Sequence, residues 1–237
     1  MEPSGAARWK LRPNEVHLWR AFVTDPEIRW PCLERILSPG ERVRANRYRF
    51  EKDRALFVLA RARLRILLAR YTKCEPEEIE LCFGARGKPE MRLQSGHEVV
   101  RFNVSHSGSV VMLGFSADRC VGVDVEKIRS LSDLETLAPS CLGEAERAHL
   151  LALREPERSR AFFRAWTLKE ALLKATGKGL AALREVELSL ADEPPKVLSL
   201  AGSTAAAARW GVGPFALAEG YVAAAAHSIP IEDRVSA

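Results

Sequence analysis

The sequence predicts an α+β fold, because two long stretches have the periodicity of amphipathic helices and several shorter ones have that of strands. Apolar residues recur at spacings of three and four between about Lys52 and Tyr71, and again between Phe162 and Ala175. Apolar and small or polar residues alternate from Val121 to Glu126, as they do in a strand. The chain has 237 residues, of which 47% are hydrophobic, so we expect an ordered core.

Strand and helix signals follow one another along the N-terminal half. The segment Glu15–Val23 alternates apolar and polar residues like a strand, and Ser38-Pro39 marks the start of a helical region. The longest helix follows it, with Phe57 and Leu64 on its apolar stripe. We then expect an antiparallel meander of strands over Ile79–Phe83, Val99–Ser105 and Val110–Phe115 that leads into the strand around Asp124.

The C-terminal half is expected to hold two helices and then strands. Pro156 ends the first helix, because proline cannot continue the helical hydrogen bonds, and Gly177 suits the C-terminal cap of the second. We find no internal repeat and no low-complexity linker. The expected elements are helices over Ser140–Leu153 and Phe162–Ala175, strands over Val186–Leu190, Val197–Leu200 and Tyr221–Ala226, and a dispensable tail from Ile231.

Composition restricts the class of protein. A net charge of +5 favours anionic partners such as nucleic acid, a nucleotide or an acidic protein. The five cysteines are scattered and free of C-x-x-C spacing, which argues against a disulfide framework or a zinc site and favours a reducing cytoplasm. No stretch is apolar enough for a membrane span, and Met1–Lys10 lacks the apolar core of a signal peptide.

Two short stretches carry the functional signal. In the first, the strand period of two places Asp124 and Glu126 on one face, beside Gly122. In the second, helical spacing places Glu170 on the apolar stripe of its helix, with Lys174 one turn further along nearly the same face. An ionised carboxylate is costly to bury without compensation, so Glu170 needs a partner.

A shared divalent metal ion is the simplest partner for these carboxylates. Oxygen donors from a strand and a helix suit Mg²⁺, which keeps water ligands and takes others from substrate phosphates. Asp124, Glu126 and Glu170 are therefore the candidate ligands, and Lys174 would pair with Glu170 or meet a phosphate oxygen. The alternative is that the strand carboxylates are exposed and that Glu170 and Lys174 form a surface pair.

Other side chains are candidates for phosphate contacts. Arg54, Arg61 and Arg65 lie along one edge of the long helix's apolar stripe, where the alternative is a solvated basic face. His106 stands between two serines at a predicted hairpin tip. The chain has no nucleophile-elbow spacing and no convincing acid for a Ser-His-Asp triad, so His106 is either a phosphate donor or a structural residue.

Taken together, these motifs resemble the 4′-phosphopantetheinyl transferases, in particular the longer surfactin-type members that activate carrier proteins. The resemblance rests on N-[IV]-S-H-S at Asn103–Ser107, on G-[IV]-D-[IV]-E at Gly122–Glu126, and on W-[ST]-x-K-E-x-x-x-K at Trp166–Lys174 followed by G-x-G-L at Gly177–Leu180. Weaker matches extend it over nearly the whole chain; they lie at Ser38-Pro39, Asp53-Arg54, Arg86–Pro89 and Gly220–Ala223.

For the fold, the resemblance implies a monomer built as a pseudo-dimer of two similar α+β halves. Each half would be a long helix on a small antiparallel sheet, with coenzyme A in the cleft between them. The halves would span residues 1–117 and 118–237, and the second would carry the metal site.

For function, the resemblance implies a cytoplasmic, Mg²⁺-dependent enzyme. It would transfer the 4′-phosphopantetheine group of coenzyme A to a serine hydroxyl of an apo carrier protein and release 3′,5′-ADP. The implied partners are coenzyme A and acidic carrier proteins or carrier domains of fatty-acid, polyketide or peptide synthases, without nucleic acid or a membrane.

The resemblance also implies roles for single residues. The three carboxylates would bind Mg²⁺ at the pyrophosphate of coenzyme A, and Lys174 and His106 would add donors to the same oxygens. Either Glu146, at the position of the family's helix glutamate, or Glu170 through a metal-bound water would be the general base. The implied contacts to coenzyme A are Arg54, Arg61, Arg86, Lys88, Pro89, Ser105, His106 and Lys174.

Two positions depart from the family's pattern, and two other classes of protein stay open. Leu142 stands where an aromatic residue is frequent, which loosens the register of Glu146. Leu56 stands where some members carry a basic phosphate ligand, so Arg54 or Arg61 would substitute.

The open alternatives are an Mg²⁺-dependent hydrolase of nucleotide or coenzyme A pyrophosphates, with water as nucleophile, and a basic nucleic-acid-binding module whose binding would fall with salt.

Overall fold

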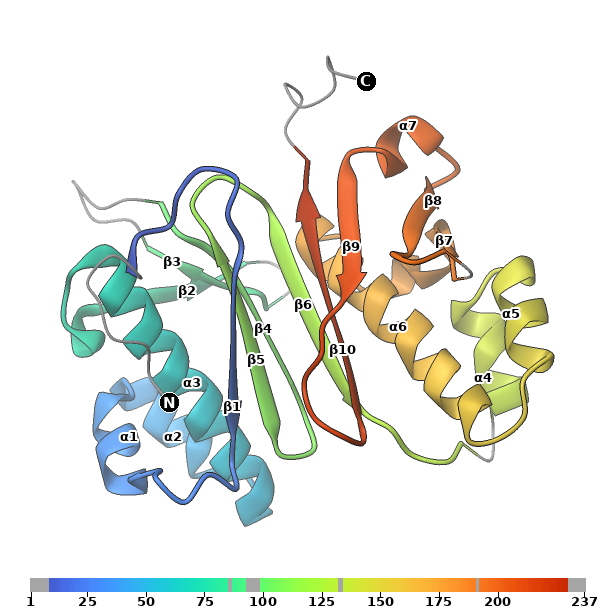
Figure 1. Ribbon diagram of the computed structural model, residues 1–237. Coiled ribbons are helices and arrows are strands. Elements are labelled where there is room, and N and C mark those ends of the chain that lie inside the picture. Colours follow the sequence, from blue (N-terminus) through green and yellow to red (C-terminus); the bar gives the residue numbers. More distant parts are fainter. Residues whose placement is uncertain (1–8, 85–86, 93–98, 132–133, 191, 230–237) are drawn as a thin grey trace. The chain divides into compact units, whose positions relative to one another are not determined.

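The computed structural model describes residues 9–84, 87–92, 99–131, 134–190 and 192–229. The chain divides into two compact units, Met1–Asp118 (unit 1) and Arg119–Ala237 (unit 2), and each has its own apolar core. Unit 1 lies at the blue and green end of the colour scale in Figure 1.

Unit 1 is built on a three-stranded antiparallel sheet. Its order is β1 (His17–Phe22), β5 (Val110–Ser116) and β4 (Arg101–Ser107), with β5 in the centre. The 22-residue helix α3 (Glu51–Thr72) packs against this sheet (Figure 1), and the apolar side chains between the helix and the sheet form the core of unit 1. The other elements are α1 (Trp30–Ile36), α2 (Pro39–Ala45), the 3₁₀ helix η2 (Pro76–Glu78) and the hairpin of β2 (Leu81–Phe83) and β3 (Pro89–Met91).

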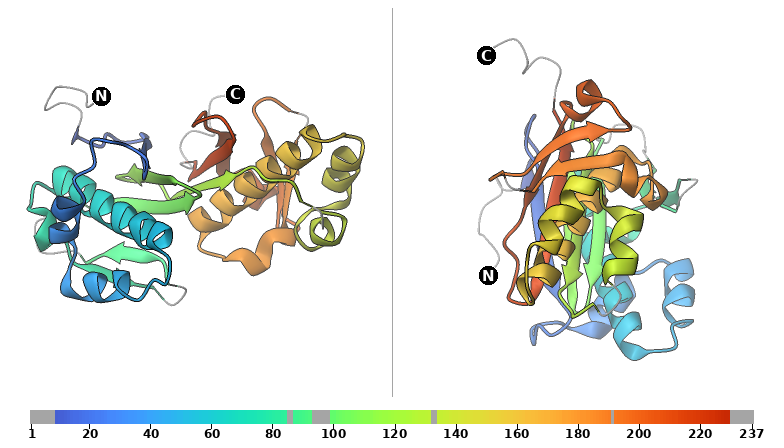
Figure 2. Two further views of the ribbon diagram at one scale, coloured as in Figure 1. Left: turned by 90° about the horizontal axis from the view of Figure 1, so that it is seen from below. Right: turned by 90° about the vertical axis from the view of Figure 1, so that its right-hand side faces the viewer.

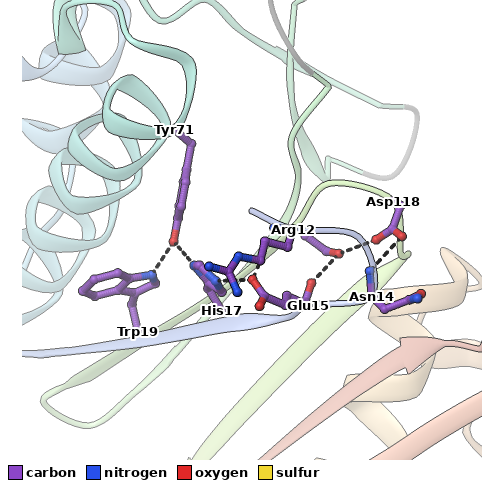
Figure 3. Close-up of polar contacts among 8 residues, drawn as sticks. Arg12, Asn14, Glu15, His17, Trp19, Tyr71 and Asp118 are labelled. Carbon is purple, nitrogen blue, oxygen red and sulfur yellow. Dashed lines mark hydrogen bonds and ion pairs between the residues drawn. The ribbon is translucent and has the colours of Figure 1, made fainter. Parts of the chain in front are cut away.

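A polar network ties β1 to the last turn of α3 (Figure 3). The Tyr71 hydroxyl accepts a hydrogen bond from Nε1 of Trp19 at 2.9 Å and lies 2.8 Å from Nδ1 of His17. The other ring nitrogen of His17 lies 3.4 Å from the Glu15 carboxylate. Burial raises the pKa of Tyr71 to about 12, so the phenol keeps its proton at neutral pH and can donate it within the network.

Replacing Tyr71 by phenylalanine is expected to destabilise the protein by about 1–3 kcal/mol, because Trp19 and His17 each lose a buried hydrogen-bond partner. Urea unfolding followed by tryptophan fluorescence measures this change. Tyr48→Phe is the matched control, since Tyr48 lies at the surface. Equal stability of the two variants would contradict a structural role for the network.

Unit 2 repeats this architecture. Its antiparallel sheet has the order β6 (Val121–Lys127), β10 (Tyr221–Ser228) and β9 (Trp210–Pro214). The 20-residue helix α6 (Glu157–Thr176) packs against β6 and β10. Two shorter helices, α4 (Leu134–Cys141) and α5 (Glu144–Leu151), lie beside α6 (Figures 1 and 2). The remaining elements are the 3₁₀ helix η3 (Leu180–Glu185), the hairpin of β7 (Val186–Ser189) and β8 (Lys196–Leu200), and α7 (Thr204–Ala207).

Both units follow the same chain path. Each begins with an edge strand, passes through short helices into one long helix, forms a two-stranded hairpin, and returns as the other edge strand and then the central strand. The expected α+β fold of two similar halves is therefore confirmed by the element order and strand order within each unit. The repeat escaped detection in the sequence because the path is shared while most side chains differ.

The expected meander is wrong at its first and last steps. Strand β2 pairs with β3 in a separate two-stranded sheet and not with β4. Strand β6 pairs with β10 and belongs to the sheet of unit 2, whereas β5 pairs with β1 and β4. Alternation in a sequence indicates a strand but not its neighbour, and the neighbour of β6 comes from the distant C-terminal segment. The expected tail from Ile231 lies outside the described residues.

Several boundaries and short elements also differ from the expectation. Helix α6 starts at Glu157, before the expected Phe162, and the region from Ser140 to Leu153 holds the end of α4 and then α5 instead of one helix. Strand β9 was not expected, because two glycines and a proline weaken its strand signal. In the described part of the chain, no helix combines the length and apolar character needed to cross a membrane.

Candidate metal and phosphate site

The site in unit 2 depends on a very close contact between α6 and β6 at Gly122. A Cβ atom built on Gly122 would lie 2.0 Å from the carbonyl oxygen of Ala171 and 2.4 Å from the amide nitrogen of Ala175. Only glycine fits there, because the neighbours are helix backbone and cannot move aside like a side chain. Asp124, the next residue on the same strand face, is thereby brought to the side chains of α6.

Three charged side chains meet at this contact. The Lys174 ammonium nitrogen lies 2.5 Å from Oδ1 of Asp124 and 3.4 Å from Oε2 of Glu170. Asp124 is 2% exposed and Glu170 is 7% exposed, whereas the Lys174 side chain is 26% exposed. The prediction that Glu170 is buried on the inner face of its helix is confirmed, and the alternative of a surface Glu170–Lys174 pair is wrong.

The site carries more negative charge than Lys174 neutralises. Burial, together with the nearby charges of Asp124 and Glu126, raises the pKa of Glu170 to about 7 against the opposing effect of Lys174. A carboxylate in such a place favours either a proton or a further cation. Two buried carboxylates and a third close enough to act on them are oxygen donors of the kind that Mg²⁺ prefers.

The three predicted ligands do not form a complete metal-binding group in this structure. Among the described residues, no three His, Cys, Asp or Glu side chains lie close enough together to hold a metal ion. Asp124 and Glu170 are bridged by Lys174, and Glu126, which is partly exposed, does not join them in such a group. The chemistry of the donors and their excess charge nevertheless fit a divalent cation.

Glu146 lies elsewhere in unit 2, in the interior. It is 4% exposed, and its Oε2 lies 2.6 Å from the ammonium nitrogen of Lys169 and accepts a hydrogen bond from the amide of Gly143 at 2.7 Å. Its Oε1 accepts from the amide of Leu188 at 3.0 Å. Both oxygens are therefore engaged within unit 2, which is unlike a base that waits for a proton from a substrate.

The burial of Lys169 was not predicted, although its helical spacing indicates it. It stands three residues after Trp166 and four before Leu173, so it falls on the apolar stripe of α6 as Glu170 does. The structure leaves it fully buried, and burial lowers its pKa while the adjacent Glu146 opposes that change.

The three arginines of α3 have different environments. Arg54 pairs with Glu34 at 2.8 Å and with Glu51 at 3.3 Å. Arg65 is 3% exposed and pairs with Glu41 at 2.7 Å, so the alternative of a solvated basic face is wrong for this residue. Arg61 also lies near Glu41, at 3.4 Å.

Arg61 retains an unused donor. Its Nη1 is buried without a hydrogen-bond partner among the described residues, and burial lowers the pKa of this guanidinium. Its guanidinium lies 5.7 Å from the centre of the Phe57 ring and 5.6 Å from that of Phe83, and the guanidinium of Arg44 lies 5.1 Å from the Phe57 ring. This group of cations and aromatic rings, which includes the unpredicted Arg44, suits an anionic aromatic ligand.

The remaining predicted phosphate contacts lie on two other segments of unit 1. Ser105 is buried and His106 is exposed at successive positions of β4, so their side chains point to opposite faces of the sheet. Lys88 and Pro89 lie partly buried at the start of β3. Arg86 lies outside the described residues.

Comparison with known proteins assigns the chain to a family. Residues 120–226 match a model described as the 4′-phosphopantetheinyl transferase superfamily, and residues 19–117 match one described as 4′-phosphopantetheinyl transferase, N-terminal. The chain is similar to 4′-phosphopantetheinyl transferase HetI of Nostoc sp., with 38% identity over 191 residues, or 81% of each chain.

Two further relatives agree. The chain is 36% identical over 163 residues to the putative 4′-phosphopantetheinyl transferase slr0495 of Synechocystis sp., covering 69% of this chain and 65% of the relative. It is 30% identical over 145 residues to 4′-phosphopantetheinyl transferase Sfp of Bacillus subtilis, covering 61% and 62%. From these matches and the motifs at the Gly122 contact, we conclude that this chain is a transferase of the 4′-phosphopantetheinyl transferase superfamily.

Proposed function

We propose that this protein transfers the 4′-phosphopantetheine group of coenzyme A to a serine hydroxyl of an apo carrier protein. Family membership supports this reaction, and the observation that carries it is the pair of buried carboxylates, Asp124 and Glu170, that both contact Lys174. A divalent cation would offset the excess negative charge of this group, and a pyrophosphate substrate would supply further oxygen ligands to that cation.

In the proposal, Asp124, Glu126 and Glu170 hold Mg²⁺. When bound, Mg²⁺ supplies charge stabilisation for the phosphate under attack and for the departing group. Lys174 would then donate to a pyrophosphate oxygen as well as pairing with the carboxylates.

We assign the nucleotide end of coenzyme A to unit 1. Arg61 is a better phosphate contact than Arg54, since Arg54 is already paired with two glutamates and Arg61 has an unused buried donor. Arg44 adds a second guanidinium close to Phe57. Lys88, Pro89, Arg86, Ser105 and His106 remain proposed contacts from the family resemblance.

The proposed reaction is a single displacement at phosphorus. The serine oxygen forms a bond to the phosphorus that carries pantetheine, and the bond from this phosphorus to the oxygen of the adjacent phosphate breaks. The departing 3′,5′-ADP keeps that electron pair, and the serine proton passes to a base. We assign the base to Glu170, because both oxygens of Glu146 are occupied by groups of unit 2.

The partner is proposed to be an acidic carrier protein or carrier domain. The net charge of +5 favours an encounter with such a partner. We further propose a monomer that works in the cytoplasm, in keeping with its five free cysteines.

One experiment tests the reaction and its main alternative. The protein is mixed with coenzyme A, Mg²⁺ and a panel of apo carrier proteins, and the products are weighed by mass spectrometry. Transfer adds the phosphopantetheine mass to a carrier serine and releases 3′,5′-ADP. Release of 3′,5′-ADP without a carrier protein would instead indicate a hydrolase, and no reaction with any carrier would reject the proposal.

Arg61→Ala is expected to raise KM for coenzyme A by about 10- to 100-fold with little change in kcat, because it removes a charge-assisted contact to the bound nucleotide. Arg54→Ala, the matched control on the same helix, should change KM by less than about threefold, since that arginine already pairs with glutamates. Steady-state kinetics against coenzyme A measures both. A larger effect at Arg54 would show that the phosphate contact is assigned to the wrong arginine.

A further inference from the structure

Each unit contains a buried glutamate at the start of a short helix, paired with a cation from the long helix. In unit 2 this glutamate is Glu146, the third residue of α5, which accepts from the amide of Gly143 and pairs with Lys169 of α6. In unit 1 it is Glu41, the third residue of α2. Glu41 accepts from the amide of Ser38 at 2.9 Å and pairs with Arg65 of α3 at 2.7 Å.

The two pairs occupy equivalent places. Arg65 and Lys169 lie equally far before Lys73 and Gly177, the left-handed residues that end α3 and α6. The same arrangement therefore occurs twice, in two units whose sequences show no visible repeat. The residue that follows the cation differs: Ile66 follows Arg65 in α3, whereas Glu170 follows Lys169 in α6.

The cation in each pair also holds backbone carbonyls of neighbouring segments. Lys169, which is fully buried, donates to the carbonyl of Cys141 at 2.9 Å and to that of Leu183 at 3.5 Å. Glu146, the partner of Lys169, accepts a hydrogen bond from the amide of Leu188 in β7. One side chain of α6 is thus fixed to α4, α5, η3 and β7 at the residue next to Glu170.

We propose that Glu146 and Lys169 are a positioning pair that fixes α6 so that Glu170 lies beside Asp124, and that Glu146 does not accept the serine proton. This inference rests on the proposed function and assigns the role of one further pair within it. The arrangement in unit 1 supports it, because Glu41 and Arg65 form the same kind of pair although isoleucine, and not glutamate, follows Arg65.

A double-mutant cycle tests the proposal with Glu146→Gln, Lys169→Met and the double variant. Glu146→Gln leaves the buried ammonium without its counter-charge, so Tm should fall by roughly 10 °C and transfer by about 100-fold. In the double variant no buried charge is left unpaired. We expect it to regain at least half of the lost Tm and to transfer within about tenfold of the wild-type rate.

A catalytic base would give another pattern. If Glu146 accepted the proton, the double variant would be as inactive as Glu146→Gln, and both would transfer about 100- to 10,000-fold more slowly than the wild type. Both variants would also lose the acidic limb of the pH–rate profile. That result would overturn the proposal. So would a double variant with no higher Tm than Glu146→Gln.

Two further measurements separate this inference from the proposed function. The rise in Tm caused by saturating Mg²⁺ should shrink in Glu146→Gln, because Glu170 is displaced, but persist in Arg65→Met, the matched variant of unit 1. An equal loss of the Mg²⁺ effect in both variants would contradict positioning. If the wild-type protein transfers nothing, the proposed function fails, while the Tm values of the cycle still decide whether the pair fixes α6.

Discussion

Replacing Asp124 or Glu170 by alanine is expected to reduce phosphopantetheine transfer by at least about 100- to 1,000-fold and to leave the fold intact. Each substitution removes an oxygen ligand from the proposed Mg²⁺ site and leaves too few donors to hold the ion beside the pyrophosphate. Stability should change little, because both carboxylates lie in a site with excess negative charge, where they repel each other. Mass spectrometry of the carrier measures transfer, and thermal unfolding measures stability.

Glu219→Gln is the control for these variants, since Glu219 is an exposed carboxylate on the same unit. It should transfer at the wild-type rate. Near-normal transfer by either Asp124→Ala or Glu170→Ala would reject the assignment of the metal site, whereas a collapse of the thermal transition would show that these carboxylates have a structural role instead.

Replacing Gly122 by alanine is expected to destabilise unit 2 by about 3 kcal/mol or more and to abolish transfer. The added methyl group would lie 2.0 Å from the carbonyl oxygen of Ala171, so α6 must move away from β6. That movement separates Glu170 and Lys174 from Asp124. Chemical denaturation and the transfer assay measure the two losses.

Gly213→Ala provides the matched control for this substitution. Gly213 lies in β9 of the same sheet, and a Cβ atom built there meets nothing within 4 Å. We expect its stability to stay within about 1 kcal/mol of the wild type, because the change adds a methyl group in open space and removes backbone freedom from the unfolded chain. If Gly122→Ala were as stable as Gly213→Ala, the close contact of α6 and β6 would be wrong.

The acidic site could be predicted largely from local patterns. Strand alternation placed Asp124 beside Gly122, and helical spacing placed Glu170 on the buried face of α6; the structure confirms both. These predictions succeeded because the period of a helix or strand decides which face a side chain shares, whatever the partner across that face.

The arginines of α3 show where local patterns fail. Spacing placed Arg54, Arg61 and Arg65 along one edge, yet only Arg61 keeps a buried donor without a partner among the described residues. Glu34 pairs with Arg54, and Glu41 pairs with Arg65. Both glutamates come from earlier helices, and the spacing of residues within α3 contains no information about them.

The sequence by itself determined the family motifs, the α+β class, the two long helices and the identity of the charged residues at the Gly122 contact. The tertiary structure decided that β6 pairs with β10, that Lys174 bridges Asp124 and Glu170, and that Glu146 is held by Lys169. The physical reason is the separation of the contacting residues along the sequence. Periodicity records which residues share a face, but an ion pair or a strand pairing depends on a second segment that only the folded chain brings close.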